Sequence, residues 1–207
     1  VKGRANAKRK RAAAESGTDY IVLCDTNGGA LPAEVLQIVQ QVKGKVSLPL
    51  GVHTHNDLDL AVANSLAAVE AGCTQVQGTL NGLGERCGNA DLCTIIGILS
   101  TKSKFKTIPE NQLRHLTETS YYLSEISNFK LPDNHPFVGH SAFAHKGGVH
   151  IDAVLKNSIA YEHVDPFLVG NHRRFLTSEL AGKMPFVLKA KEMNLDLDKK
   201  SPETEKL

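Results

Sequence analysis

The segment with the clearest chemical potential places two histidines two positions apart, His53 and His55, at the end of a short apolar run. If this run is a β-strand, residues i and i+2 point to the same face, so both imidazoles converge at the carboxyl end of the strand. Two neutral imidazoles at that spacing suit a divalent cation. A pair of strand histidines that hydrogen bond to the backbone is the simpler structural interpretation.

A second polar segment follows one more apolar run, and this glycine-broken loop carries Glu85, Arg86 and Asn89. An amide or carboxylate oxygen from this loop could reach the same place as the two histidines. Asn56 and Asp57 directly follow the histidine pair, and such short polar residues ahead of an apolar run are typical of a helix start. The top of a strand beside a helix N-terminus is where α/β proteins place function.

Alternating strands and helices must position these groups. Residues 20–24 read as a buried strand that is apolar on both faces. Because strands alternate with helices, the pattern predicts a parallel sheet whose strand ends share one edge, and Thr26 follows the first of these strands. The expected strands are 20–24, 46–52 and 74–80, and the expected helices are 32–42, 58–71 and 90–101.

The pattern changes after residue 102. A polar connector leads to a helix that we expect over 109–127, and seven of the nine histidines lie beyond residue 110. One face of that helix should be apolar. The residues expected on that face are Leu113, Leu116, Tyr121 (or Tyr122) and Leu123.

Composition excludes several classes of function. The 207 residues suffice for a domain with a hydrophobic core. The net charge of +2 gives no electrostatic argument for nucleic acid or a membrane surface. No apolar run approaches the ~20 residues that span a bilayer, and the start lacks a secretory pattern. The basic cluster within residues 3–16 is short and is interpreted as a solvated helix face ended by Gly17.

The four cysteines form no C-x-x-C pair. Cys24 and Cys73 lie within or beside apolar runs, so we expect buried, reduced thiols in a cytoplasmic protein. The loop at 82–88 also invites comparison with the dinucleotide-binding pattern G-x-G-x-x-G. The match fails because Cys87 stands where the third glycine should be.

Two segments in order, residues 53–57 (HTHND) and 81–89 (NGLGERCGN), resemble the paired signatures of the isopropylmalate, homocitrate and citramalate synthases. The run from about residue 20 onward is most similar to the citramalate-synthase branch. The resemblance implies an α/β fold that is the C-terminal part of a (β/α)8 TIM barrel, with about three βα units in residues 1–102. Residues 103–207 would form truncated, mostly helical post-barrel subdomains. The chain begins at Val1 rather than Met, so we expect a fragment of a longer enzyme.

The resemblance also implies an activity. The family comprises acyltransferases that condense acetyl-CoA with a 2-oxo acid, which is pyruvate for this branch and gives citramalate for isoleucine and leucine biosynthesis. We therefore expect a cytoplasmic homodimer that uses small-molecule substrates and binds neither nucleic acid nor membrane.

Site residues follow from the same resemblance. The expected ligands of a divalent metal are His53, His55 and Asn89, while the family's fourth ligand, an aspartate after the first barrel strand, has no counterpart here. Histidine and oxygen ligands do not select among magnesium, manganese and zinc. Thr26 stands where the family binds the carboxylate of the 2-oxo acid. Glu85 and Arg86 should hold the loop and its ligand.

Two later segments resemble the post-barrel subdomain of these synthases. Residues 143–153 contain His150, and residues 161–166 begin with Tyr161, whose family counterpart comes from the partner subunit. The two residues are the candidate base and proton relay. The resemblance assigns no role to the three histidines His145, His163 and His172, which are expected on the surface or behind the site.

Several alternatives stay open. The chain could belong to a 2-isopropylmalate or homocitrate synthase, or to a lyase or carboxyltransferase of the same barrel superfamily. A non-catalytic chain that only pairs with other subunits is the alternative from another class. A hydrolase with His-x-His on its first strand is disfavoured by the βα unit that precedes the motif.

Overall fold

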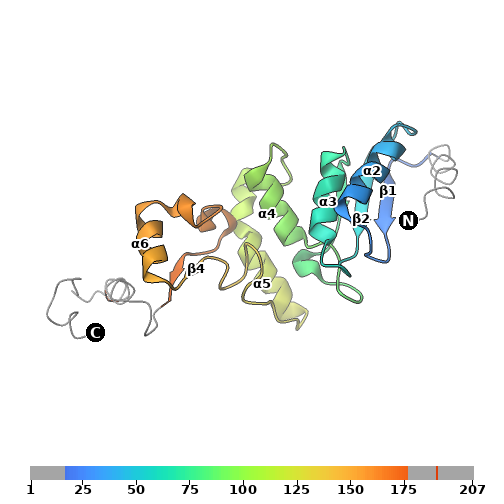
Figure 1. Cartoon of the computed structure of the whole chain (residues 1–207). Coiled ribbons are helices and arrows are strands. Elements are labelled where there is room, and N and C mark those ends of the chain that lie inside the picture. The colour runs from blue at the N-terminus through green and yellow to red at the C-terminus, as the bar shows by residue number, and fades with distance from the viewer. Residues whose placement is uncertain (1–16, 177–189, 191–207) are drawn as a thin grey trace. The chain divides into compact units, whose positions relative to one another are not determined.

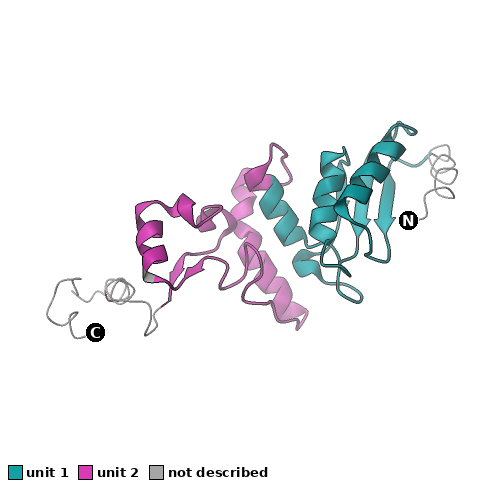
Figure 2. Ribbon diagram, viewed as in Figure 1, with its two compact units in different colours: residues 1–99 teal, residues 100–207 magenta. Residues whose placement is uncertain are grey.

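The computed structural model describes residues 17–176 and residue 190, which fall into two compact units, 1–99 and 100–207 (Figures 1 and 2). The first unit is α/β and the second is mostly helical. The expected basic helix at 3–16 lies outside the described residues, as does the C-terminal tail apart from residue 190.

The first unit is built on a parallel sheet of three strands in the order β1-β2-β3, so each strand pairs with the next strand along the chain. This arrangement confirms the predicted alternation and the parallel sheet. The described residues form no closed barrel. The elements are β1 (Ile21–Asp25), α2 (Pro32–Lys43), β2 (Leu50–Thr54), α3 (Ala61–Glu70), β3 (Gln75–Gln77), the 3-10 turn Leu80–Gly82 and α4 (Leu92–Lys102).

The two faces of this sheet differ in burial. Leu23 and Val52 point toward the helices and pack in one apolar cluster with residues of α2 such as Val39. The register aligns Cys24 with His53, so both lie on the opposite face. The expectation that residues 20–24 are buried on both faces, Cys24 included, is wrong, because Cys24 is exposed and only the helix side of β1 is covered in the described structure.

The element boundaries differ from the prediction near the histidine pair. Strand β2 begins at Leu50 rather than at residue 46, and α3 begins at Ala61 rather than at residue 58. Asn56 still serves the helix, since its Oδ1 accepts a hydrogen bond of 3.0 Å from the backbone N–H of Ala61. The intervening residues form a turn in which Asp59 has a φ of 59°, and this turn delays the helix.

The second unit contains the predicted helix at 109–127 as a 3-10 segment followed by α5. Of the residues expected on its apolar face, Leu113 and Leu116 are buried and Leu123 is half-buried, but Tyr121 and its alternative Tyr122 are both exposed, so neither tyrosine extends the buried face. Ser120, one turn after Leu116, is buried in their place. The elements are Glu110–His115 (3-10), α5 (Leu116–Ile126), β4 (Ala144–His145), α6 (Gly148–Lys156), Ser158–Ala160 (3-10), Pro166–Val169 (3-10) and β5 (Arg174–Phe175), with β4 and β5 paired in parallel. Among the described helices, none has the length and apolar character that crossing a membrane would require.

Candidate functional site

The structure brings the two histidines and the predicted amide to one edge of the first unit. His53 lies in β2, and the ring of His55 meets it edge to face with the ring centroids 5.1 Å apart. His55 also forms an isolated antiparallel bridge with Asn89. The loop after β3 therefore reaches the end of β2, as the sequence predicted.

These three side chains share a hydrogen-bonding feature. Nδ1 of His53, Nδ1 of His55 and Oδ1 of Asn89 are all buried and lack a hydrogen-bond partner among the described residues. A buried polar atom without a partner is costly, so three of them at one edge indicate a missing ligand. Burial, and then the proximity of His55, lower the pKa of His53, which favours the neutral imidazole that binds metals.

A divalent cation fits this donor set, because two imidazoles and an amide oxygen are ordinary ligands for such ions. The described residues contain no group of three or more His, Cys, Asp or Glu side chains that could hold a metal. The three residues above fall outside that pattern because the third is an amide. The side chains therefore supply no negative charge, and a carboxylate would strengthen the site.

Glycines set the orientation of the amide. A Cβ on Gly84 would lie 2.4 Å from Nδ2 of Asn89, so only glycine leaves room for that amide group. Nδ2 in turn donates to the carbonyl oxygen of Leu83 at 3.2 Å. Because the nitrogen is engaged, the oxygen is the free end of the Asn89 amide. Gly88, with a φ of 95°, accepts a hydrogen bond from the N–H of Asn56 and ties the loop to the end of β2.

Arg86 contacts neighbouring loops rather than the predicted ligand of its own loop. Its guanidinium pairs with both carboxylate oxygens of Asp57 and also donates to the carbonyl oxygen of Thr26. The hydrogen bond from Arg86 is the main cause that lowers the pKa of Asp57. Glu85 is 86% exposed and approaches Arg86 only at 3.8 Å. Sequence reasoning treated Asp57 only as a helix-start residue and missed its pairing.

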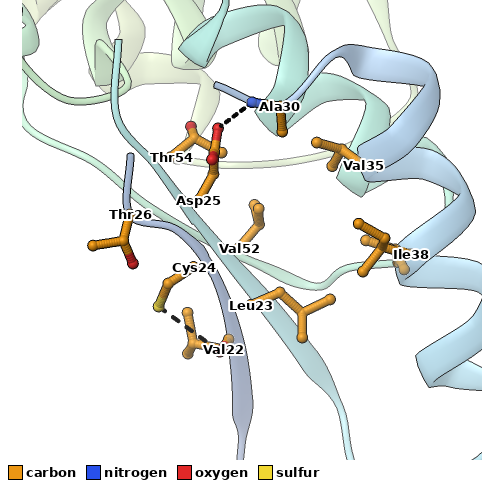
Figure 3. Close-up of a pocket in the computed structure, with 11 residues that line it drawn as sticks. Val22, Leu23, Cys24, Asp25, Thr26, Ala30, Val35, Ile38, Val52 and Thr54 are labelled. Atoms are coloured by element: carbon orange, nitrogen blue, oxygen red, sulfur yellow. Dashed lines mark hydrogen bonds between the residues drawn. The ribbon is translucent and has the colours of Figure 1, made fainter. Parts of the chain in front are cut away.

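A pocket of about 300 Å³ lies along β1, between the sheet and α2 (Figure 3). Thr26 is one of its lining residues. Asp25 is also there, and its Oδ2 accepts a hydrogen bond from the backbone N–H of Ala30. The remaining wall is largely apolar, with side chains such as Val35 and Ile38 from α2.

The predicted pair in the second unit is also assembled. The rings of His150, in α6, and Tyr161 lie 4.7 Å apart between centroids at an angle of 35°. Both residues are exposed, Tyr161 to 46%. A Cβ on Gly147 would approach Nδ1 of His150 at 3.4 Å, an ordinary contact distance for a close neighbour. The pair therefore belongs to one surface of the second unit.

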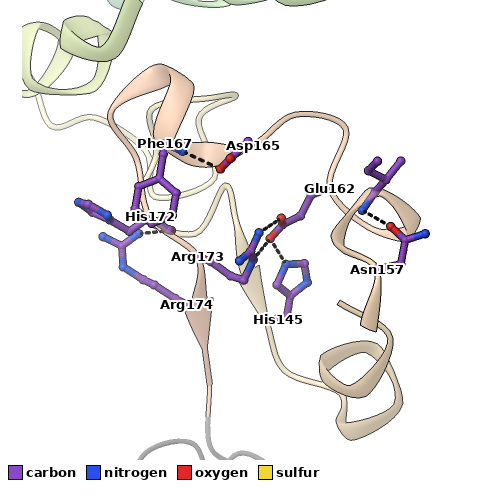
Figure 4. A network of polar contacts seen from close by, with 9 residues as sticks. His145, Asn157, Glu162, Asp165, Phe167, His172, Arg173 and Arg174 are labelled. Carbon is purple, nitrogen blue, oxygen red and sulfur yellow. Dashed lines mark hydrogen bonds and ion pairs between the residues drawn. The ribbon is translucent and has the colours of Figure 1, made fainter. Parts of the chain in front are cut away.

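A network of ion pairs around Glu162, the residue after Tyr161, was not predicted (Figure 4). Glu162, whose side chain is 2% exposed, accepts hydrogen bonds from Nε of Arg173 at 2.6 Å and from Nε2 of His145 at 3.0 Å. Burial alone would raise the pKa of Glu162, but the bonds from Arg173 and His145 outweigh that effect and the net shift is downward. The only signal in the sequence was a glutamate beside a candidate tyrosine, which is too common to interpret.

The chain matches two family models. The HMGL-like model matches residues 5–123, and the homocitrate synthase post-HMGL domain-like model matches residues 137–205. The first match covers more than half of the chain. It includes every residue discussed above in the first unit.

Curated relatives agree with these matches. The chain is 54% identical to the (R)-citramalate synthase of Aquifex aeolicus and 49% identical to that of Geobacter sulfurreducens, in each case over 95% of this chain and 37% of the relative. It is 38% identical to the 2-isopropylmalate synthase of Methanocaldococcus jannaschii, over 90% of this chain and 36% of that protein. The chain thus spans little more than a third of the length of the relatives it matches.

A solved structure shows the same fold. The HMG-CoA lyase of Acinetobacter baumannii, in complex with coenzyme A and 3-methylmalate, matches with a TM-score of 0.55 and 27% identity, over 63% of this chain and 44% of that one.

Proposed function

The chain belongs to the HMGL-like family, and from that premise we propose that it is part of a synthase that condenses acetyl-CoA with a 2-oxo acid, pyruvate in particular, to give citramalate. Identities of 54% and 49% to two citramalate synthases, against 38% to a 2-isopropylmalate synthase, support pyruvate over a longer acid. The observation that carries the proposal is the set of three buried, unpartnered atoms on His53, His55 and Asn89.

In this proposal those three residues hold a divalent cation. When held by these residues, such a cation would supply Lewis acidity toward the ketone of the 2-oxo acid. Thr26 follows β1 at the same sheet edge, and its hydroxyl donates to the carboxylate of the 2-oxo acid.

The second unit supplies proton transfer. The methyl group of a thioester is a weak carbon acid, so a base must lie against it. His150 accepts that proton, and Tyr161, whose ring lies beside it at an angle of 35°, relays protons in the same step. Both side chains are exposed on their own unit, so a substrate held elsewhere can reach them.

The remaining assignments extend the same proposal. Residues 1–102 form the C-terminal part of a TIM-barrel catalytic domain, and residues 103–207 form post-barrel subdomains. The complete enzyme is a cytoplasmic homodimer of amino-acid biosynthesis that leads toward isoleucine or leucine. Glu85 and Arg86 support the loop that carries Asn89.

The test measures metal and turnover on the same samples. Residues 1–207 are expressed alone and then together with the complementary N-terminal half of a full-length synthase. Calorimetry reports metal binding, and release of CoA from acetyl-CoA and pyruvate reports condensation. We expect weak metal binding and no sustained CoA release from the chain alone, because three uncharged ligands hold a dication poorly. Metal binding and sustained CoA release should both appear when the N-terminal half is also present.

The comparison of substrates separates the alternatives. Faster CoA release with a longer, branched 2-oxo acid than with pyruvate would assign the chain to a 2-isopropylmalate-type enzyme. Cleavage of hydroxymethylglutaryl-CoA without any condensation would assign it to the lyases. No metal binding and no reaction with both halves present would leave a non-catalytic chain and contradict the proposal.

A further inference from the structure

The loops that follow the three strands of the first unit are joined by one side chain, Arg86. It belongs to the loop after β3, and it contacts Asp57 after β2 and Thr26 after β1. We propose that Asp57 and Arg86 form a clamp that positions Thr26, and that Asp57 is thereby a positioning residue for the carboxylate of the 2-oxo acid. This inference rests on the proposed role of Thr26 in substrate binding.

The hydrogen bonds of the clamp fix the orientation of the Arg86 guanidinium. Nε of Arg86 donates to Oδ1 of Asp57 at 2.7 Å, and Nη2 donates to Oδ2 at 2.9 Å. Such a bidentate pair fixes the plane of the guanidinium. The same Nη2 also donates to the carbonyl oxygen of Thr26 at 3.0 Å. The carboxylate therefore determines where the donor meets the backbone of Thr26, and a lysine could not reproduce this arrangement.

The first loop also packs directly against the carboxylate. Gly28 has a φ of 63°, and a Cβ placed on it would lie 2.3 Å from Oδ2 of Asp57. Glycine is thus required for both the backbone conformation and the close approach. Asp57 supports the loop through Arg86 at Thr26 and by direct contact at Gly28.

The far end of the same loop is held by buried groups. The N–H of Ala30 donates to Oδ2 of Asp25 at 3.2 Å, and its carbonyl oxygen accepts from Nδ2 of Asn64 at 2.8 Å. Asp25 is 5% exposed and Asn64 is fully buried. The end near Thr26 is held instead by side chains that remain partly exposed, at 42% for Arg86 and 23% for Asp57. The position of Thr26 is therefore the part of the loop that depends on the clamp.

A clamp of this kind affects binding more than folding. Partly exposed ion pairs contribute little to the stability of a protein. Displacement of Thr26, in contrast, removes a polar contact that the proposed function assigns to one substrate. Loss of the clamp should therefore raise KM for the 2-oxo acid and leave KM for acetyl-CoA unchanged.

The experiment uses the full-length synthase that carries this chain, with the variants Asp57→Asn and Arg86→Lys. We expect KM for pyruvate to rise by roughly 10- to 100-fold, the range for a lost charge-assisted hydrogen bond. KM for acetyl-CoA, metal content and Tm should stay near those of the parent. The matched control is Glu118→Gln, which removes the charge of Glu118 from its exposed pair with His115, 2.8 Å apart at the start of α5, and should change none of these values.

Two further variants separate positioning from stability. Exogenous guanidinium should partly restore KM for pyruvate in Arg86→Ala, because it can occupy the place between the carboxylate and the Thr26 carbonyl. The reversed pair Asp57→Arg with Arg86→Asp should not restore it, since the donor to Thr26 is then on the wrong loop. Equal rises in both KM values, or recovery in the reversed pair, would overturn the inference.

The proposed function can fail separately. If the parent enzyme shows no condensation, the clamp is judged by hydrogen exchange at the amides of residues 27–29. Faster exchange in Asp57→Asn, but not in Glu118→Gln, supports the clamp even then. Unchanged exchange in Asp57→Asn refutes it whether or not the enzyme is active.

Discussion

The histidines of the two candidate sites differ in burial and in the contacts that their rings make. His53 and His55 in the first unit are held with a buried Nδ1 atom that has no partner among the described residues. His150 in the second unit is exposed, and its ring contacts that of Tyr161 at a tilted angle. A metal site must withhold competing hydrogen bonds from its ligands, whereas a proton-transfer group must be reachable by the substrate. The difference agrees with the metal-binding role proposed for His53 and His55 and the acid–base role proposed for His150.

The two arginine–carboxylate pairs show a parallel contrast. Arg173 and Glu162 pair in the interior of the second unit, where the glutamate side chain is 2% exposed. Arg86 and Asp57 pair where both side chains remain partly exposed. A buried pair broken on one side leaves an uncompensated charge and destabilises the fold, while an exposed pair mainly sets local geometry.

The variants with the largest expected effect test the contrast between His53 and His150. In the full-length enzyme, His150→Ala should lower kcat by about 10²–10⁴-fold, the usual contribution of an acid–base group, with metal content unchanged. His53→Ala should instead lose metal. Steady-state kinetics and metal analysis of the same samples check both. Loss of metal in His150→Ala would show that the two regions are not chemically distinct.

The next prediction concerns whether the second unit serves the active site of its own subunit or that of the partner. His150 and Tyr161 contact one another within one unit, so they should serve the same active site. Mixing His53→Ala chains with Tyr161→Phe chains should restore part of the activity if the second unit acts on the partner subunit. A mixture of His150→Ala and Tyr161→Phe should restore none.

If heterodimers form and the first mixture stays inactive, Tyr161 acts within its own subunit or not at all. Recovery in the second mixture would mean that the histidine and the tyrosine serve different sites, despite their contact.

A smaller effect sharpens the contrast between the ion pairs. Glu162→Gln should lower the free energy of unfolding by about 3 kcal/mol, the lower end of the range for a buried pair, because the Arg173 side chain left without its partner is 28% exposed. Urea unfolding at neutral pH measures this change. Asp57→Asn serves as the comparison and should shift the unfolding midpoint far less.

The same variant tests the pH dependence of unfolding. The pKa of Glu162 is lowered in the fold, so its stabilising contribution is complete above the ordinary carboxyl pKa and is lost as pH falls through the lower folded value. Acid unfolding of the parent should therefore show a step that Glu162→Gln lacks. Identical acid transitions in both proteins would contradict the assignment.

The smallest effect concerns the two faces of the sheet. Burial raises the pKa of the Cys73 thiol to about 11, partly offset by Lys43, while Cys24 lies exposed on the other face. Iodoacetamide at mildly alkaline pH should modify Cys24 and leave Cys73 intact, because the thiolate is the reactive form. Mass spectrometry of the native protein, with a denatured sample as control, reads out the difference. Equal labelling of the two would mean that the helix side is open.

Sequence reasoning succeeded where local period and chain order determine the structure. Alternating strands and helices predicted the parallel sheet, and the i, i+2 spacing placed His53 and His55 on one edge. It failed where a distant partner decides the outcome. Arg86 and Asp57 are separated by 29 residues, and no local pattern pairs them. The buried Glu162 was missed for the same reason, since its partner Arg173 comes from another segment.

The predicted helix boundaries were wrong for a different reason. Asn56 was expected to cap the helix, but the cap position of α3 is Leu60. The side chain of Asn56 reaches forward to the N–H of Ala61 across a turn, so the helix begins later than the polar residues suggest. In the second unit, helical period alone could not choose which residues of α5 face inward. Small Ser120 is buried there and the two larger tyrosines are not.

The order of the strands has a kinetic consequence. Because β1, β2 and β3 are neighbours both in the sheet and along the chain, each strand pairs with the strand that is made next, as Ile21 does with Leu50. The residues from His53 to Asn89 precede the second unit along the chain, so they leave the ribosome before that unit is complete. A cation captured at that stage would add its binding free energy to the nascent first unit. The metal would then act as a folding partner of the enzyme before it acts in catalysis.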